Sequence, residues 1–243
     1  MSDHALFGVA PFVSVVILVV AATVRALHHN PVSAGPSLAV GRRLAAKHPL
    51  AAIGLLGVLL GHVVMIAWPD QLLTWNRNVS RLIAFELALF GLGAAALVGI
   101  VAAIRRHVLR RTADGSSAAD AAFLAAVLLT FVSGLGIALV YRWAAVWSVM
   151  TVTHYARSLL SLQPSVERLE AMPYLVKLHI FSSFIVIALL AFTRLVDVLL
   201  TVLVRAVTVV TSPFVSIVER QRRLLQDWAL RCSRSLLWPE EED

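Results

Sequence analysis

Two histidines stand at matched depth in two long apolar segments of the sequence. His62 lies about six residues before Trp68, and His179 lies about six residues after Pro173. At 1.5 Å of rise per helical residue, each histidine is roughly 9 Å from the end of its segment. An imidazole inside a membrane span needs a polar partner, because an unsatisfied polar group in hydrocarbon is costly. One haem iron between the two rings could satisfy both.

Zinc fits this pair less well, because no cysteine or carboxylate stands at ligand spacing from either histidine. Haem held by histidines of facing helices is a standard site in helix bundles. Three glycines, Gly54, Gly57 and Gly61, precede His62 on one helix face. Such residues commonly allow helices to pack closely. We expect Gly61 also to lie against the cofactor.

The remaining histidines fit exposed or interfacial positions. They are His4, His28, His29, His48, His107 and His154. His48 stands directly before Pro49, at the mouth of an apolar segment, and an interfacial position is the default reading. For His154 a surface role and a role in a quinone site both stay open.

The whole chain has the composition of an integral membrane protein. Of its 243 residues 59% are hydrophobic and only 14% are charged, and the mean hydropathy is +0.84. Five runs are long enough to cross about 30 Å of hydrocarbon. They are Ala5–Leu27, Pro49–Trp68, Leu82–Ile104, Ala118–Trp147 and Pro173–Val204. The sequence therefore predicts an all-α fold, a bundle of five transmembrane helices.

The basic residues lie between these runs and set the orientation. The first and third connections and the tail are rich in arginine, whereas the second and fourth mix acidic and basic residues. By the positive-inside rule, the N-terminus is outside and the C-terminus is cytoplasmic. The net charge of +7 also comes from these basic residues between the apolar runs and in the tail. Because no recognition motif accompanies it, nucleic acid is not an expected partner.

Two domains are expected. Residues 1–209 would form the five-helix transmembrane cytochrome b domain, and residues 210–243 a cytoplasmic amphipathic tail. The tail mixes apolar residues such as Trp228 with arginines, so it would lie on the inner membrane surface or dock a partner. The single cysteine, Cys232, excludes an internal disulfide and a CxxCH haem attachment. A cleavable signal peptide is not expected.

Four short stretches of the sequence resemble a known family. Residues 53–62, IGLLGVLLGH, look like the second helix of the respiratory nitrate reductase gamma subunit. The stretches 155–158, 177–179 and 192–195 look like that family's fifth helix and the segment before it, and Pro11 and Arg25 fit as well. The resemblance implies a multi-pass cytochrome b of the inner (plasma) membrane. Such a subunit oxidises quinol near the outer face and passes electrons through two b haems to iron–sulfur and molybdenum subunits.

The resemblance assigns His62 and His179 as ligands of the outer haem. At the positions that match the ligands of the inner haem, this sequence has Ala52 and Asp197. Alanine cannot ligate, and aspartate is a poor ligand for low-spin iron, so one haem b is predicted. The electron partner stays open: an outer cytochrome c type protein, an additional subunit that reaches iron–sulfur subunits, or a displaced second haem at His48.

A quinone site is expected beside the outer haem. The family has a lysine at the outer start of its third helix, where this chain has Ser80 followed by Arg81. Arg81 could donate a hydrogen bond to a quinone oxygen, or it could extend to the membrane surface. Glu86 is a carboxylate inside the third span and could accept a proton from quinol. The alternative for Glu86 is a salt bridge with Arg81 or Arg142.

Three classes of function could account for these features. The first is the quinol-oxidising or quinone-reducing subunit of a membrane oxidoreductase complex, and it accounts best for the histidine pair. The second is a non-catalytic anchor with structural haem or none. A transporter is disfavoured, since no inverted repeat is visible and few polar residues line the spans. A complete enzyme is not expected, because the chain has no motif for a terminal donor or acceptor.

Overall fold

Helices make up all the secondary structure in the described part of this computed structural model. That part comprises residues 3–28, 48–114, 118–142, 146–193, 195–196, 220–222 and 226. The chain divides into two units, residues 1–198 and 199–243. The helical bundle belongs to the first unit. Nearly all of the predicted tail, together with Asp197 and His29, lies outside the described residues, so the domain boundary stays a prediction.

Four described helical stretches are long and apolar enough to cross a membrane. The first comprises η1 (Ala5–Val9) and α1 (Ala10–His28), and the others lie in α3 (Pro49–Ala67), α5 (Val79–Asp114) and α6 (Ala118–Tyr141). They match four of the five predicted spans. The fifth corresponds to α9 (Tyr174–Leu190), which is apolar but has only 17 residues. The membrane-spanning helical class is confirmed, and the count of five and the orientation stay predictions.

Prolines define the ends of the histidine-bearing helix α3. Pro49 and Pro69 occupy first-turn positions of α3 and of the short helix α4 (Pro69–Trp75). Proline suits the first turn because its missing N–H is not needed there. Trp68, directly before Pro69, leaves the helical region with φ −129° and ψ 57°. The chain therefore changes direction just after α3.

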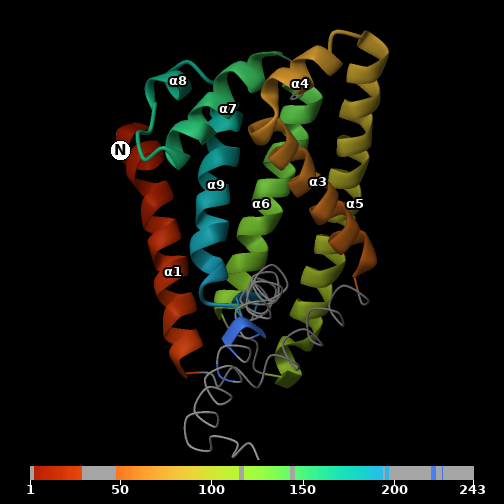
Figure 1. Cartoon of the computed structure of the whole chain (residues 1–243). Coiled ribbons are helices and arrows are strands. Elements are labelled where there is room, and N and C mark those ends of the chain that lie inside the picture. The colour runs from red at the N-terminus through yellow and green to blue at the C-terminus, as the bar shows by residue number, and fades with distance from the viewer. Residues whose placement is uncertain are drawn as a thin grey trace, which may run out of the picture. The chain divides into compact units, whose positions relative to one another are not determined.

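The predicted fourth span was too long. Helix α6 ends at Tyr141, and Arg142 has φ 49°, in the left-handed region that a non-glycine residue enters at a cost. Trp147 lies instead on a separate helix, α7 (Val146–Leu160). The sequence analysis treated α4, α7 and α8 (Glu167–Glu170) as loops, and all three lie at the same end of the bundle (Figure 1).

Small residues let α3 and α5 approach closely. A Cβ added at Gly54 would collide with the backbone oxygen of Leu92, and one at Gly99 would collide with the backbone nitrogen of Ala51. One added at Gly61 would lie 2.8 Å from the Leu89 side chain. The glycine face of α3 is thus a helix-packing surface. A cofactor contact at Gly61 stays a prediction.

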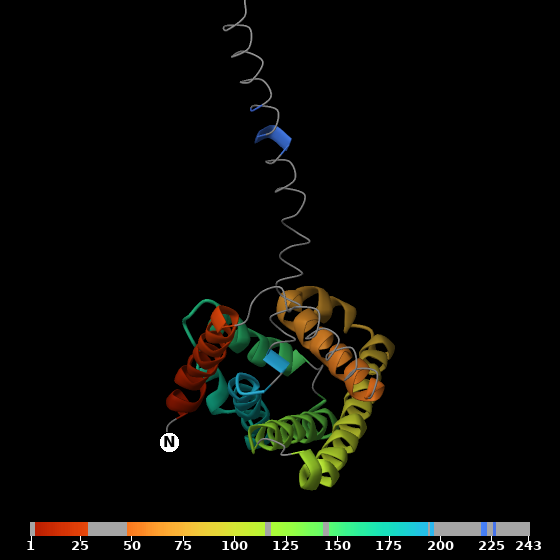
Figure 2. The ribbon, with the colours of Figure 1, turned by 90° about the horizontal axis from the view of Figure 1, so that it is seen from below.

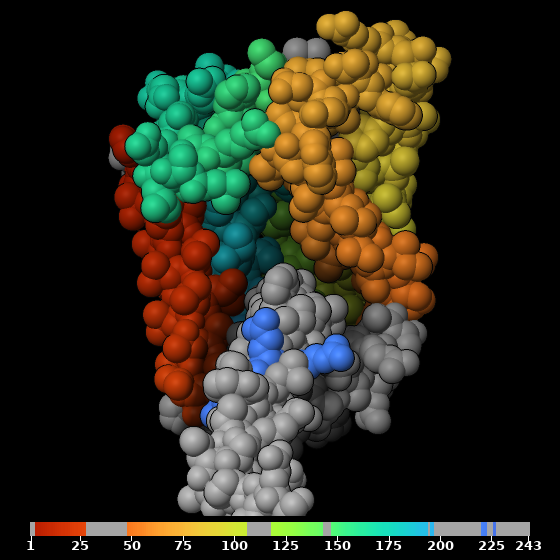
Figure 3. Space-filling model, in the orientation of Figure 1, coloured from red at the N-terminus to blue at the C-terminus, as the bar shows by residue number. Residues whose placement is uncertain are grey.

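The helices follow one another around the interior rather than all packing together. α1 packs on α9, α9 on α6, α6 on α5, and α5 on α3. The view along the bundle shows the same succession (Figure 2). On the face drawn in Figure 3, the surface is hollowed between α1 and α3, and α9 and α6 lie behind. The two histidine-bearing helices, α3 and α9, therefore have different main neighbours.

Candidate functional site

His62 of α3 and His179 of α9 meet inside the bundle. Their ring centroids lie 6.3 Å apart, and the ring planes are tilted by 28°. Two metal–nitrogen bonds of about 2 Å each, with half an imidazole ring added on either side, span about 6 Å. The spacing therefore fits one metal centre held between the rings.

The hydrogen bonds of both rings establish which nitrogen carries the proton. Nδ1 of His62 lies 2.8 Å from the carbonyl oxygen of Val58, and Nδ1 of His179 lies 2.9 Å from that of Thr130. A carbonyl oxygen can only accept, so each Nδ1 donates, and in the neutral form of the ring the lone pair is then at Nε2. This is the tautomer that a metal-ligating histidine adopts when its other nitrogen is held by a carbonyl.

Helix α6 contributes to the site through residues that the sequence analysis missed. The Ser133 hydroxyl oxygen lies 3.3 Å from Nδ1 of His179, and Gly134 lies directly against the same ring. The sequence feature that could have pointed to this helix is a pair of polar residues, Thr130 and Ser133, three positions apart in an apolar span. That spacing places them on one helix face, but does not reveal which neighbour the face meets.

Arginines from other helices hold the ends of α3 and α9. Arg157 of α7 donates to the carbonyl oxygens of Ile66 and Ala67, at 2.8 and 3.1 Å. Arg25 of α1 donates to those of Thr193 and Ala191, at 2.9 and 3.3 Å. The last carbonyls of a helix have no partner within it, and the negative end of the helix dipole attracts cations. These contacts help fix both histidine-bearing helices along their axes.

The start of α9 is anchored as well. Lys177 forms an ion pair with Asp3 at 2.6 Å and donates to the carbonyl oxygen of Glu170 at 3.1 Å. Nearby, the buried hydroxyl of Tyr155 donates to the carbonyl oxygen of Phe7 at 2.7 Å. Burial raises the pKa of the Tyr155 phenol. The stretches that carry the family resemblance thus tie α7, α9 and the N-terminus together.

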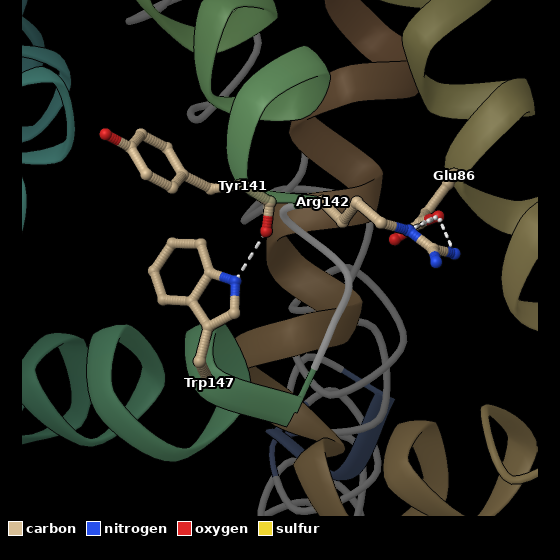
Figure 4. A network of polar contacts seen from close by, with 4 residues as sticks. All are labelled: Glu86, Tyr141, Arg142 and Trp147. Atoms are coloured by element: carbon tan, nitrogen blue, oxygen red, sulfur yellow. Dashed lines mark hydrogen bonds and ion pairs between the residues drawn. The ribbon is translucent and has the colours of Figure 1, made fainter.

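Glu86 pairs with Arg142, one of the two partners considered from sequence. Two guanidinium nitrogens of Arg142 donate to Oε2 of Glu86, at 2.8 and 3.2 Å (Figure 4). The side chain of Glu86 is 15% exposed, against 56% for Arg142. Its other oxygen, Oε1, is buried and makes no hydrogen bond within the described part of the chain. One carboxylate oxygen thus contacts the guanidinium group, and the other has no hydrogen-bond partner among the described residues.

Arg81 has a different environment from Glu86. Its guanidinium carbon lies 4.8 Å from the centre of the Trp75 ring, a cation–π contact. Both residues line a surface pocket of about 380 Å³ together with Asp70, Gln71 and Thr74. The structure therefore does not join Arg81 and Glu86 in one contact network, and their shared role at a quinone stays a prediction.

The other sequence candidates lie away from the ring pair. His48 is the N-cap residue of α3, and Ala52 lies one turn into that helix. His154 is exposed on α7. Within the described ranges, no cluster of three or more His, Cys, Asp or Glu side chains could hold a metal ion. The candidate centre is therefore a two-ligand site.

Long apolar helices that bring two histidine rings together in the interior define a helical membrane protein. The chain matches the family model of the nitrate reductase gamma subunit over residues 3–220, and it belongs to that family. The members are membrane cytochrome b subunits of multi-subunit complexes. No individually curated protein matches the chain.

Proposed function

We propose that the chain is the membrane cytochrome b subunit of a respiratory oxidoreductase complex and exchanges electrons between the quinone pool and a partner subunit. One haem b would be held by His62 and His179 near the outer face of the inner membrane. The observation that carries this proposal is the tautomer and spacing of the two rings. Both have the lone pair at Nε2, and their centroids are 6.3 Å apart.

When bound, a haem with two histidine ligands supplies one-electron transfer, since no iron position is open to oxygen. The protein's part is to hold and orient the ligands. Val58 and Thr130 fix the ring tautomers, and the arginine contacts at Ile66 and Thr193 hold the two helices in place. Rigid ligand placement reduces the reorganisation needed when the centre changes its charge.

The protons of quinol need a separate acceptor. Oxidation of a quinol to a quinone releases two electrons and two protons. Oε1 of Glu86 would accept one proton, which weakens the ion pair with the exposed Arg142, and the second proton would pass to water at the outer surface. The two electrons would leave the quinol one at a time, through the centre held by His62 and His179, to the partner subunit. Arg81, beside Trp75 in the surface pocket, would donate a hydrogen bond to a quinone oxygen.

The inner half of the bundle supports a single haem. Ala52 stands on α3 where the family has a ligand, and Ala51 packs against Gly99 of α5 at backbone distance. A haem in this region would need both a ligand and space between these helices. The partner would then be a cytochrome c type protein outside, or an iron–sulfur subunit reached through a further component. The tail, residues 210–243, would lie at the cytoplasmic surface.

Haem stoichiometry of the purified full-length chain tests the proposal. Pyridine haemochrome analysis is expected to find one haem b per chain, reducible by a quinol analogue. His62→Ala and His179→Ala should each abolish the low-spin spectrum, whereas His154→Ala, at an exposed position on α7, should retain it. Two haems per chain would disprove the single-haem assignment. Absence of haem, or haem inert to quinol, would favour a non-catalytic anchor.

A further inference from the structure

We propose that a notch on α6, formed by Thr130, Ser133 and Gly134, orients the His179 ring and tunes its strength as a ligand. The inference deepens the proposed function, because it takes His179 as an axial ligand. The three residues lie within two turns of one helix and all contact the same imidazole. They are positioning residues, which act through His179.

The steric part of the notch is Gly134. A Cβ at this position would lie 2.9 Å from Cε1 and 3.2 Å from Nδ1 of His179. Real Cβ atoms essentially never approach a neighbour below 3.0 Å. Cε1 lies between the two ring nitrogens, so a push on this atom displaces Nε2 as well. The absence of a side chain at Gly134 therefore permits the observed ring position.

The polar part of the notch supplies two acceptors to one N–H. The Thr130 carbonyl oxygen lies 2.9 Å from Nδ1 of His179, and Ser133 Oγ lies 3.3 Å from it. The Ser133 hydroxyl donates its own proton to a backbone carbonyl, that of Leu129 at 2.8 Å or Thr130 at 3.0 Å. Its lone pairs therefore face the imidazole N–H. Ser133 is 2% exposed, so water does not compete strongly for this contact.

The two histidines differ in how they are held. Nδ1 of His62 bonds a carbonyl of its own helix, one turn earlier. Nδ1 of His179 bonds a carbonyl of a different helix, so its orientation depends on how α6 packs against α9. Thr130 reinforces that packing, because its Oγ1 lies 3.0 Å from the hydroxyl of Ser182 and shares its proton between that hydroxyl and the Ala126 carbonyl oxygen at 2.9 Å.

Acceptors at Nδ1 increase the basicity of a ligating imidazole. A more basic ligand stabilises the oxidised metal, and hydrogen bonds of this kind are among the factors that set haem potentials. Removing the Ser133 acceptor should therefore make the centre easier to reduce. Removing a hydroxyl that does not face the ring should have no such effect.

Ser133→Ala and Ser183→Ala form the first matched pair. Both side chains donate to a backbone carbonyl, but the Ser183 hydroxyl bonds the carbonyl of His179 rather than its ring. In redox titrations of the full-length chain in detergent, Ser133→Ala should raise the reduced-to-oxidised haem ratio at least threefold at the wild-type midpoint. It should also shift the electron paramagnetic resonance signal of the ferric centre. An unchanged titration and signal would overturn the tuning role.

Gly134→Ala and Gly136→Ala form the second pair. A Cβ at Gly136 would meet only the flexible end of Leu175, at 3.1 Å, so this control should keep wild-type haem content. Gly134→Ala should lose most of the low-spin haem signal per chain. Normal haem content in Gly134→Ala would overturn the steric role. If Gly134→Ala does not accumulate, the redox titration and the ferric signal of Ser133→Ala test whether the notch acts on His179. A wild-type chain without haem would instead overturn the proposed function itself.

Discussion

Arg157 of α7 donates from Nε to the carbonyl oxygen of Ile66 at 2.8 Å, across the C-terminus of the helix that carries His62. Arg25 of α1 makes the equivalent contact beyond the C-terminus of α9, which carries His179. Each histidine-bearing helix is therefore capped by an arginine from another element. The two helices run in opposite directions, so the caps act at opposite ends of the bundle.

Replacing Arg157 by alanine should remove the cap at the C-terminus of α3 and so destabilise the fold. Two hydrogen bonds from a charged group are lost, and because Arg157 is exposed, water replaces part of them, which leaves a cost of about 1 kcal/mol. Thermal unfolding in detergent should show a lower midpoint for Arg157→Ala. Arg168→Ala, at an exposed position on α8, is the control. Equal midpoints for both variants would show that the cap is energetically neutral.

Glu86→Gln should slow haem reduction by quinol, because an amide cannot take up the proton at Oε1. The expected loss is roughly a hundredfold, the lower end of the range for a removed general base. Stopped-flow absorbance at the haem band measures the rate, with Glu167→Gln on α8 as the control. Dithionite reduction should stay normal. A quinol rate that matches the wild type would remove Glu86 from the mechanism.

Tyr155 should give the folded protein a specific sensitivity to alkaline pH. Burial raises its pKa above the ordinary value of 10, so the unfolded chain loses this proton at a lower pH than the folded chain. The contribution to stability is therefore complete below pH 10 and falls as the pH rises further. Tyr155→Phe should lower stability by about 1 kcal/mol at pH 8, through the bond to Phe7, and should show a smaller alkaline loss.

Unfolding midpoints at pH 8 and pH 10.5 measure this difference. Tyr174→Phe serves as the matched control, since Tyr174 is 78% exposed. If the wild type and Tyr155→Phe lost the same stability between the two pH values, Tyr155 would not be the group responsible.

Gly54→Ala should disturb the packing of α3 on α5, because the added methyl group meets the backbone of Leu92 and Ala96. Overpacking of this kind costs about 1–3 kcal/mol. Gly91→Ala is the control, since a Cβ there has open space within 4 Å. The unfolding midpoint should fall in the first variant only. Equal stability would mean that the two helices can separate at little cost.

Much of the fold could be predicted from sequence because hydropathy and helix-ending signals are local. The apolar runs predicted the four spans found among the described residues, and Pro49 and Pro69 indicated where α3 and α4 begin. The prediction failed where the backbone conformation depends on the tertiary surroundings rather than on local sequence. No residue pattern signals that Arg142 adopts φ 49°, since a left-handed arginine depends on what surrounds it. The fourth span was therefore extended as far as Trp147.

The sequence by itself determined that two imidazoles lie at one depth in apolar helices, since depth follows from counting residues along each helix. Only the tertiary structure decided what surrounds them, because helix rotation and neighbour choice depend on packing along the whole length of each helix. Packing selected Arg142 over Arg81 as the partner of Glu86 and directed the face of Gly61 toward Leu89. It also brought Ser133 and Gly134 of α6 against the ring of His179.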